Sequence, residues 1–420
     1  MNILVVGGGG REHAIALSLF NSPLTKKLIV APGNPGIEKF AECKPIAADD
    51  IDGQCKLAKD MHANIVFIGP ETPLVLGLKD KLTKIGIKAF GPTAKAAQLE
   101  GSKTFSRNFC KRHNIPQPKF KYCSDLKTAE NEIKLLKGYC VVKADGLAAG
   151  KGVDVCETIE QALKASKEML EENKFGDAGK SILIEERING IEASVFAVSD
   201  GDNVTLLGTA QDHKRAYDND EGPNTGGMGA ISPAPALNED LIRTIKENII
   251  IPTIQGMKSE GMEYEGILYA GIMLTKDGPK IIEFNCRFGD PETQVVLPRL
   301  KTDLVEIIRR SVEKQIKDFE IELIEDTAIT VVLASKGYPG SFEKQIILPL
   351  FNEFENLEDI TIYHSGTSIN EDKKLVSNGG RVLCVTSLGS NIQSCREKAY
   401  EVINKLNWDK GFYRKDIGKL

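Results

Sequence analysis

Several features that would place this chain among membrane, disulfide-rich or zinc proteins are absent from it. No apolar run reaches the roughly 18 residues that a membrane helix needs, and apolar segments such as Ile65–Ile68 and Ile249–Ile251 have the length of strands. The nine cysteines are scattered without a Cys-x-x-Cys pair, and the five histidines lie far apart. This usage is typical of reduced thiols and argues against a disulfide framework or a zinc site.

An excess of basic charge is absent too. The net charge is -5, whereas nucleic-acid-binding proteins usually present a basic face. We therefore expect no nucleic-acid partner, although a local basic pocket for a phosphate remains compatible with this charge. Met1 leads directly into a strand-like run, so we expect no signal peptide and a cytoplasmic location. With roughly 150 residues per domain, 420 residues suggest about three domains.

The first hundred residues alternate between strands and helices, which predicts a parallel α/β sheet. Strands are expected at 2–6, 28–30 and 65–68, and each ends in a loop rich in glycine or proline. Ligands of such sheets bind beyond the carboxyl ends of the strands. We therefore expect a ligand at this edge of a first domain, residues 1–101.

The rest of the chain has a mixed α+β pattern, which we divide into a middle domain, 102–324, and a last domain, 325–420. The expected strands are 119–122, 139–143, 153–156, 181–185, 195–198, 204–209, 328–334 and 382–387. The expected helices are 158–172, 240–260, 302–317 and 391–405.

The glycine run Gly7–Gly10, followed by Arg11, lies between a strand and a helix, where backbone N–H groups suit a phosphate. It is not a dinucleotide fingerprint, because the third glycine position holds Glu12 or His13 and no acidic residue ends the second strand. Arg11 could add a charge-assisted contact to a phosphate monoester. The alternative is a tight turn that needs glycine for its geometry alone.

The segment from Lys143 to Val153 is rich in glycine and alanine and lies between two expected strands, so it predicts a hairpin flap. A P-loop is excluded, because the positions that need glycine and Ser/Thr hold Asp145 and Gly152. Small residues with the lysines Lys143 and Lys151 could cover a triphosphate. A mobile surface hairpin is the alternative.

The segment Lys280–Arg287 alternates like a strand, with Glu283, Asn285 and Arg287 on one face. The other face carries Ile282, Phe284 and Cys286. A carboxylate and an amide oxygen two residues apart could both bind Mg²⁺ that also holds phosphates, with Arg287 directed at a phosphoryl group. A solvated polar face of a sheet is the alternative.

Further polar segments concentrate at Gln211–Arg215, at Pro223–Gly229 and at Gly101–Lys103. Together with the segments above they resemble the phosphoribosylamine–glycine ligases, a family of ATP-grasp enzymes. The resemblance runs from Gly9 to Gly418. Its most specific blocks are Ala31–Asn34, Gly91–Ala94, Leu99–Lys103, Lys143–Val153, Gln211–Arg215, Gly222–Ala230, Glu283–Gln294 and Asn378–Leu383.

The resemblance implies a three-part fold: a Rossmann-like N-terminal domain, an ATP-grasp core with a mobile flap at about 120–190, and a small C-terminal domain. It implies ligation of glycine to 5-phosphoribosylamine, with ATP as co-substrate, Mg²⁺ or Mn²⁺ as cofactor and a glycyl phosphate intermediate. Such chemistry needs positioning and charge neutralisation. We expect a monomer with small-molecule substrates, no membrane partner and no second enzyme fused behind it.

The resemblance also implies roles for individual residues. The ATP-binding residues would be Lys103, Lys143, Gly150, Lys151, Gly152, Glu185, Glu186, Ile188 and Glu192. The metal ligands would be Glu283 and Asn285. The substrate-binding residues would be Gly9, Gly10, Arg11, Asn34, Asp212, His213, Lys214, Pro223, Asn224, Arg287 and Asp290. Of the catalytic residues Arg287, Asp290 and Lys143, the aspartate would face the glycine ammonium.

One departure from the ATP-grasp pattern concerns the metal. Many of these enzymes have another carboxylate about a dozen residues before the Glu-x-Asn pair, but the stretch Leu268–Met273 contains no acid. Three alternatives to the function stay open: another ATP-grasp ligase of purine metabolism, a nicotinamide oxidoreductase, and a nucleotide-binding module without catalysis.

Overall fold

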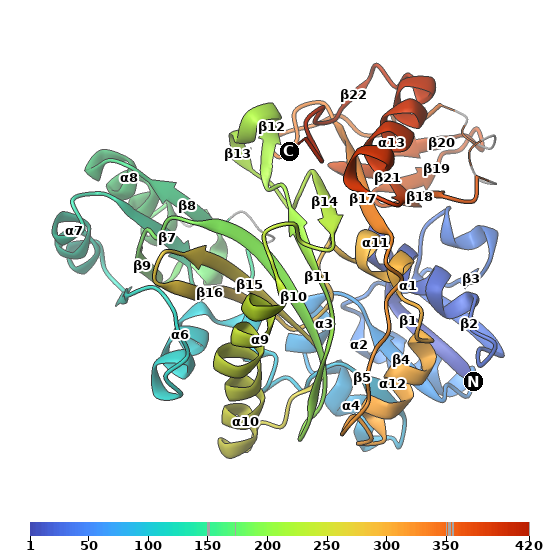
Figure 1. Ribbon diagram of the computed structural model, residues 1–420, viewed down its shortest axis with the longest axis horizontal. Helices are drawn as coiled ribbons and strands as arrows, with labels where there is room; N and C mark the ends of the chain where they lie inside the picture. Colours follow the sequence, from blue (N-terminus) through green and yellow to red (C-terminus); the bar gives the residue numbers. More distant parts are fainter. Residues whose placement is uncertain (149–151, 173, 350, 352–353, 355–356, 420) are drawn as a thin grey trace.

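The computed structural model describes residues 1–148, 152–172, 174–349, 351, 354 and 357–419 (Figure 1). Its N-terminal part is a parallel sheet of five strands in the order β3-β2-β1-β4-β5, which confirms the predicted α/β pattern. The strands are β1 (Asn2–Gly7), β2 (Lys27–Pro32), β3 (Glu42–Cys43), β4 (Ile65–Ile68) and β5 (Lys88–Phe90). The helices are α1 (Gly10–Phe20), α2 (Ile51–Asp60), α3 (Glu71–Val75) and α4 (Leu78–Lys84).

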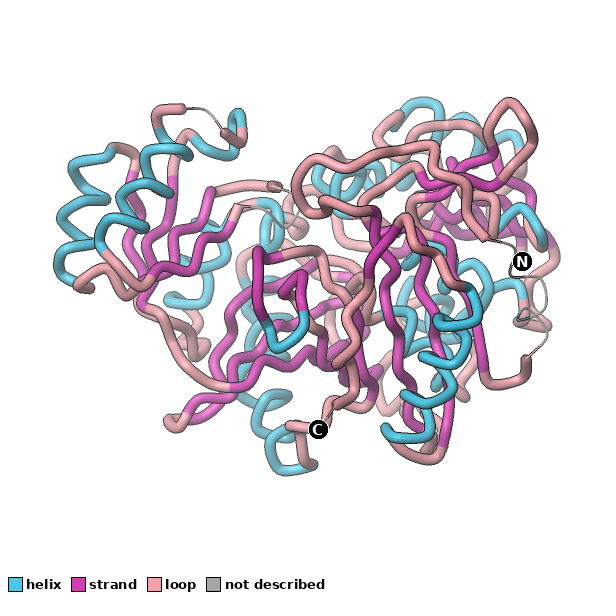
Figure 2. The backbone as a smooth tube through the Cα atoms, turned by 90° about the horizontal axis from the view of Figure 1, so that it is seen from above, coloured by secondary structure: helices cyan, strands magenta, loops and turns pink. Residues whose placement is uncertain are grey.

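The flap region is an antiparallel sheet with two helices, standing at one end of the molecule (Figure 2). Its strands, in the order β6-β9-β7-β8, are β6 (Phe120–Cys123), β9 (Ile182–Glu186), β7 (Cys140–Ala144) and β8 (Val153–Cys156). Helices α7 (Leu126–Leu135) and α8 (Ile159–Leu170) share a separate apolar core with it. β7 and β8 pair as the predicted hairpin, with Lys143 opposite Val153. Helices α5 (Gln98–Gly101) and α6 (Lys103–Arg112) precede this region.

A nine-stranded sheet joins the middle of the chain to its C-terminal part. Its path is β16-β15-β10-β11-β14-β17-β21-β18, with β22 beside β17. The strands are β10 (Ile191–Asp200), β11 (Val204–Asp212), β14 (Gly229–Ser232), β15 (Glu265–Thr275), β16 (Gly278–Asn285), β17 (Thr327–Ser335), β18 (Ile360–His364), β21 (Arg381–Gly389) and β22 (Gly411–Phe412). Because β14 pairs with β17, residues on both sides of the expected boundary at 324/325 belong to one sheet.

Smaller elements complete the fold. They are two ribbons, β12 (Arg215–Tyr217) with β13 (Glu221–Asn224) and β19 (Thr367–Ile369) with β20 (Leu375–Ser377), and the helices α11 (Thr293–Val296) and α13 (Ile392–Leu406). The N-terminal sheet packs on both faces: one apolar core includes residues of β15 and β16, and the other includes residues of β10 and of the helix that starts at Leu304. Among the described residues no helix has both the length and the apolarity to cross a bilayer.

Two predicted helices differ from the structure. The helix expected over 240–260 is interrupted: α9 (Glu239–Ile245) and α10 (Ile251–Ser259) flank a π-helical turn at Lys246–Ile250. Pro252 explains the interruption, because its ring clashes with the carbonyl four residues earlier. The helix expected over 302–317 is the shorter α12 (Leu304–Val312), which starts at an Asp303 cap.

Asn34 ties the N-terminal sheet to the C-terminal strands. Its side-chain amide donates to the carbonyls of Gly8 (2.9 Å) and His364 (3.0 Å), and its side-chain oxygen accepts from the Gly36 N–H (2.9 Å). The residue is 6% exposed. Its polar atoms are thus engaged within the protein, so Asn34 holds two distant parts of the chain together.

Replacing Asn34 by alanine should therefore lower the stability of the fold. The carbonyls of Gly8 and His364 and the N–H of Gly36 would lose their partner, which we expect to cost about 1–3 kcal/mol, measured by urea unfolding. Asn131→Ala, at an exposed position of α7, is the matched control and should change stability by less than about 0.5 kcal/mol. Equal effects of the two substitutions would contradict the tethering role.

Candidate functional site

The strand that carries Glu283 departs from the predicted alternation. β15 and β16 shift register so that Gly271 faces Glu283 while Ile272 faces Ile281. This bulge places Ile281, in place of the expected Ile282, in the core with Phe284. The strand also ends at Asn285, so the prediction of Arg287 on the same strand face was wrong.

The bulge leaves the carbonyl of Ile282 available to cationic side chains. It accepts a hydrogen bond from Lys143 Nζ (3.2 Å) and another from Arg107 Nη2 (2.6 Å). Both cations also pair with Glu185, at 2.9 Å from Lys143 and at 2.6 Å from Arg107. Burial alone would raise the pKa of Glu185, but the two cations outweigh it and lower that pKa to about 2. Glu185 therefore fixes Lys143 in place, and sequence reasoning missed its partner Arg107.

Three lysines from different elements lie close enough to Glu283 to lower its pKa. Lys103, the first residue of α6, donates to the carbonyl of Gly146 (3.0 Å). Burial and the neighbouring charge of Lys143 lower the pKa of the Lys103 ammonium. Burial would raise the pKa of Glu283, yet the cations Lys214, Lys143 and Lys103 lower it. The site therefore holds an ionised carboxylate close to three ammonium groups, and such ammonium groups can bind a polyphosphate.

The residues expected to bind a metal have uncommitted oxygen atoms. Within the described ranges, neither the Glu283 carboxylate nor the Asn285 amide makes a hydrogen bond or an ion pair within 4.0 Å. Carboxylate and amide oxygens are the donors that Mg²⁺ and Mn²⁺ prefer. Since the described residues contain no group of three acidic, histidine or cysteine ligands, a bound ion would take its remaining ligands from water or phosphate.

The segment that follows β11 brings further charge to the same region. Lys214 forms an ion pair with Glu192 and lies 3.4 Å from Asp212. Its carbonyl accepts from the N–H and the hydroxyl of Thr225, both at 2.8 Å. The buried Nδ1 of His213 has no partner among the described residues, and burial lowers the pKa of this imidazole. The predicted residues Glu192, Asp212, His213 and Lys214 thus lie together.

Arg287 lies between two carboxylates that sequence reasoning missed. Its Nε is 2.9 Å from Glu71 and its Nη2 is 2.8 Å from Glu100. Burial raises the pKa of Glu100 to about 7 despite the opposing effect of Arg287, whereas Arg287 lowers the pKa of Glu71 to about 2. Arg287 is also close enough to Glu283 to lower its pKa. The guanidinium therefore borders the lysine-rich region from a fixed position.

A carboxylate of the protein itself, that of Glu12, already binds the donors at the start of α1. The carboxylate of Glu12 accepts from the N–H of Gly9 (2.8 Å) and from Nε of Arg11 (2.6 Å). Arg11 also donates to the carbonyl of Phe288 (3.1 Å) and is 6% exposed. Gly10 is closely covered, because a Cβ there would lie 2.4 Å from Ser365 Oγ. Gly9, Gly10 and Arg11 thus lie together, but the guanidinium is held by protein partners.

Asp290 connects three parts of the chain. Its carboxylate accepts from Gln294 (2.8 Å), lies 3.4 Å from Nη2 of Arg381 and accepts from the backbone N–H of Arg11. Burial would raise the pKa of Asp290, but Arg381 and Arg11 lower it. Asp290 is therefore an ionised junction between α1, α11 and β21. Its partner Arg381 belongs to the Asn378–Leu383 block, to which the sequence assigned no role.

The remaining predicted residues lie at the margins of this arrangement. Glu186, at the end of β9, accepts from the N–H of Lys119 (2.9 Å), and Ile188 follows it with intermediate exposure. Pro223 is exposed and Asn224 pairs with Arg215 in the β12–β13 ribbon. Gly152 is buried, whereas Gly150 and Lys151 lie outside the described residues.

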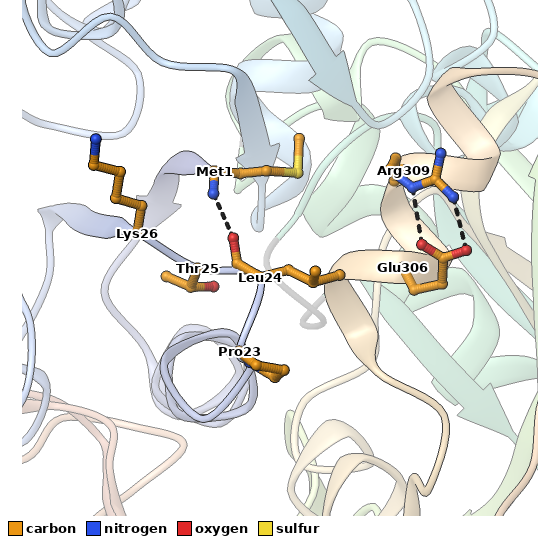
Figure 3. Close-up of a pocket in the computed structure, with 7 residues that line it drawn as sticks. All are labelled: Met1, Pro23, Leu24, Thr25, Lys26, Glu306 and Arg309. Carbon is orange, nitrogen blue, oxygen red and sulfur yellow. Dashed lines mark hydrogen bonds and ion pairs between the residues drawn. The ribbon is translucent and has the colours of Figure 1, made fainter.

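A surface hollow of about 820 Å³ lies elsewhere (Figure 3). It is lined by Met1, Pro23, Leu24, Thr25, Lys26, Glu306 and Arg309. In Figure 3 the Met1 amino group bonds to the Leu24 carbonyl, and Arg309 pairs with Glu306 on α12. None of the predicted site residues lines this hollow, so the candidate site is defined by the charged groups described above.

Glu292 is a buried carboxyl beside these groups. It is 3% exposed, and Ser194 Oγ lies 3.5 Å from its Oε1. Burial and the charge of Asp212 raise the pKa of Glu292 to about 7, against the opposing effect of Lys214. At neutral pH the folded protein therefore holds a proton there that the unfolded chain has lost.

This raised pKa predicts a pH dependence of stability. Glu292 stabilises the fold below its unfolded pKa of 4.5, and that contribution declines up to about pH 7. Glu292→Gln cannot titrate, so its stability relative to the wild type should rise between about pH 5 and about pH 8, measured by urea unfolding. Glu239→Gln, at an exposed position, should run parallel to the wild type. A parallel curve for Glu292→Gln would refute the raised pKa.

Comparison with known families assigns residues 1–293 and 328–420 of this architecture. The N domain of phosphoribosylglycinamide synthetase matches residues 1–100, its ATP-grasp (A) domain matches residues 101–293 and its C domain matches residues 328–420. The phosphoribosylamine–glycine ligase of Escherichia coli is 46% identical over 424 residues, covering 100% of this chain and 98% of that protein. The Yersinia pestis enzyme of the same name is 45% identical over 421 residues, with coverage of 100% and 98%.

Solved structures agree with this assignment. The crystal structure of phosphoribosylamine–glycine ligase from Thermotoga maritima matches with a TM-score of 0.86 and 32% identity, covering 99% of this chain and 100% of that chain. The biotin carboxylase domain of Hydrogenobacter thermophilus 2-oxoglutarate carboxylase shares the fold, with a TM-score of 0.73, 15% identity and coverage of 98% and 91%. The resemblance and the fold class expected from the motifs are confirmed, and the chain belongs to the phosphoribosylglycinamide synthetase family of ATP-grasp proteins.

Proposed function

We propose that this protein joins glycine to 5-phosphoribosylamine at the expense of ATP, giving glycinamide ribonucleotide, ADP and phosphate in de novo purine synthesis. The observation that carries this proposal is the set of three lysines, Lys103, Lys143 and Lys214, around the ionised Glu283. Such a set neutralises a polyphosphate without supplying a nucleophile. Full-length relatives named phosphoribosylamine–glycine ligase support the same reaction.

The reaction would take two displacements. A glycine carboxylate oxygen attacks the γ-phosphorus of ATP, and the bond from that phosphorus to ADP breaks. The amine nitrogen of phosphoribosylamine then attacks the acyl carbon, the bond to phosphate breaks, and the nitrogen loses a proton. Both steps develop negative charge on phosphate oxygens, so fixed cations lower the barrier. Lys143 is fixed by Glu185, and Arg287 is fixed by Glu71 and Glu100.

We assign the roles by position. The phosphates of ATP would be held by Lys103 and Lys143 and, in the flap, by Gly150, Lys151 and Gly152. The adenosine would be held by the segment Glu185–Ile188 and by Glu192. Arg287 would face the transferred phosphoryl group. The substrates would be bordered by Asp212, His213, Lys214, Pro223 and Asn224. Gly9–Arg11 would lie at the phosphoribosylamine end. Asp290, expected from the resemblance to face the glycine ammonium, we place between the two substrates, because its carboxylate joins α1 to β21.

Glu283 and Asn285 would hold a divalent cation, for which Mg²⁺ is our choice and Mn²⁺ the alternative. When bound, the ion would neutralise phosphate charge and align the γ-phosphoryl group. The uncommitted oxygens of the two side chains support this choice. We further propose that the protein acts in the cytoplasm as a monomer on small molecules, with domains 1–101, 102–324 and 325–420.

The reaction is tested by metal-dependent ADP release with glycine and freshly generated phosphoribosylamine, each omitted in turn. We expect release only when both are present, with glycinamide ribonucleotide formed in equal amount. Release with a different acid and amine, but not with this pair, would favour another ATP-grasp ligase and refute the substrate assignment.

The metal assignment predicts that Glu283→Gln loses turnover by about a hundredfold or more, because an uncharged amide is a poor ligand for a divalent cation. Thermal unfolding without ligands should show only a modest loss of stability, because the nearby cations lower the pKa of Glu283 and so favour its ionised form in the fold. Glu239→Gln, at an exposed position, is the matched control and should retain wild-type turnover. Wild-type turnover of Glu283→Gln at limiting metal would exclude Glu283 as a ligand.

A further inference from the structure

The arginine at the start of β21 lies beside Asp290, at the junction of α1, α11 and β21. Nη1 of Arg381 donates to the carbonyls of Gly226 (2.8 Å) and Asp290 (2.6 Å), and Nη2 lies 3.4 Å from the Asp290 carboxylate. The carboxylate is the only acidic partner within ion-pair distance in the described chain. Arg381 is thus held from one side, by one edge of its guanidinium.

The other edge of this guanidinium is not engaged. Within the described residues Nε makes no hydrogen bond, and the side chain is 20% exposed. Gly226, against which the guanidinium lies, is itself exposed. A Cβ at Gly226 would come within 3.1 Å of the guanidinium carbon, so glycine permits this close approach. Two to three donors of a fixed, always charged group therefore remain available to an anion.

The backbone around Arg381 is braced from two directions. The ring of Tyr338 packs on Gly380, where a Cβ would lie 2.2 Å from the ring. The hydroxyl of the same tyrosine accepts from the N–H of Gly226 (3.0 Å). Two consecutive glycines before Arg381 thus let an aromatic residue clamp the turn against the 225–227 loop. This bracing fixes where the guanidinium points.

The alternative cations near the expected sugar-phosphate position are already satisfied. Arg11 donates hydrogen bonds to Glu12 and to the Phe288 carbonyl, and Arg287 lies between two carboxylates. Arg381 has a single carboxylate partner, and that partner, Asp290, also accepts from the backbone N–H of Arg11. Of these three arginines, Arg381 is therefore the one with spare donors, and Asp290 connects it to Gly9–Arg11.

We propose that Arg381 binds the 5-phosphate of phosphoribosylamine, with Asp290 as the residue that positions it. This inference deepens the proposed function and rests on it for the identity of the substrate. A phosphate monoester matches the forked donors of a guanidinium. The three lysines near Glu283 would then serve ATP, and the C-terminal part of the chain would recognise the second substrate.

The test compares Arg381→Gln with the wild type. We expect KM for phosphoribosylamine to rise about tenfold to hundredfold, as the loss of charge-assisted hydrogen bonds predicts, while KM for ATP and for glycine change less than about twofold. Binding of ribose 5-phosphate, measured by calorimetry, should weaken by the same factor. Arg381→Lys should recover part of the affinity, because it keeps the charge but not the fork.

Arg396→Gln is the matched control. Like Arg381, this arginine of the C-terminal part donates to backbone carbonyls, but it does not contact Asp290. It should leave KM for phosphoribosylamine unchanged. An equal rise of all three KM values in a folded Arg381→Gln variant, or unchanged binding of ribose 5-phosphate, would overturn the proposal. If Arg381→Gln does not fold, Arg381→Lys decides by the same readings.

The two proposals can fail separately. A wild-type protein that forms no glycinamide ribonucleotide refutes the proposed function, and binding of ribose 5-phosphate to the wild type and to Arg381→Gln still tests the phosphate site. A wild-type protein that forms the product while Arg381→Gln keeps a normal KM for phosphoribosylamine refutes only the assignment of Arg381.

Discussion

The arrangement of the site depends on one buried carboxylate, Glu185, between Arg107 and Lys143. A buried charge without partners is costly, so these three groups must stay together. They come from α6, β7 and β9, and both cations also bond to the bulged carbonyl of Ile282 on β16. The flap sheet and the large sheet are thereby joined at the point where the polyphosphate would bind.

The same constraint operates at the junction of the three domains. Asp290 is buried and ionised, and its partners come from α1, α11 and β21. Arg287 is held nearby by Glu71 and Glu100, both from the N-terminal part. Ion pairs between separate parts keep cations at fixed positions, and fixed cations are what transfer of a phosphoryl group requires.

The two ends of the site also differ in the kind of cation that they contain. Lysines gather around Glu283, where burial and mutual repulsion make an anionic ligand favourable. Arginines gather around Asp290, where forked donors suit a single phosphate. Lys214, one of these lysines, also pairs with Glu192 and lies 3.4 Å from Asp212. The charge of Asp212 in turn helps to raise the pKa of the buried Glu292.

The sequence by itself determined the alternating pattern of the N-terminal part, the hairpin of β7 and β8, the family and the set of residues that carry charge. Those features follow from periodicity and from short motifs, in which neighbours along the chain decide the outcome. It did not reveal the bulge at Ile282, because that depends on the pairing of β16 with β15. Nor did it reveal that the helix over 240–260 is interrupted in its middle at Pro252.

Only the tertiary structure decided which charges pair with which. Arg11 lies against Phe288, Arg287 against Glu71 and Arg381 against Asp290, and these partners are 91 to 277 positions apart in the chain. No local pattern encodes such pairs, since the need of a buried charge for a partner arises only when distant segments pack together. The sequence therefore shows which chemical groups the protein has, whereas the fold decides which of them are available to a ligand.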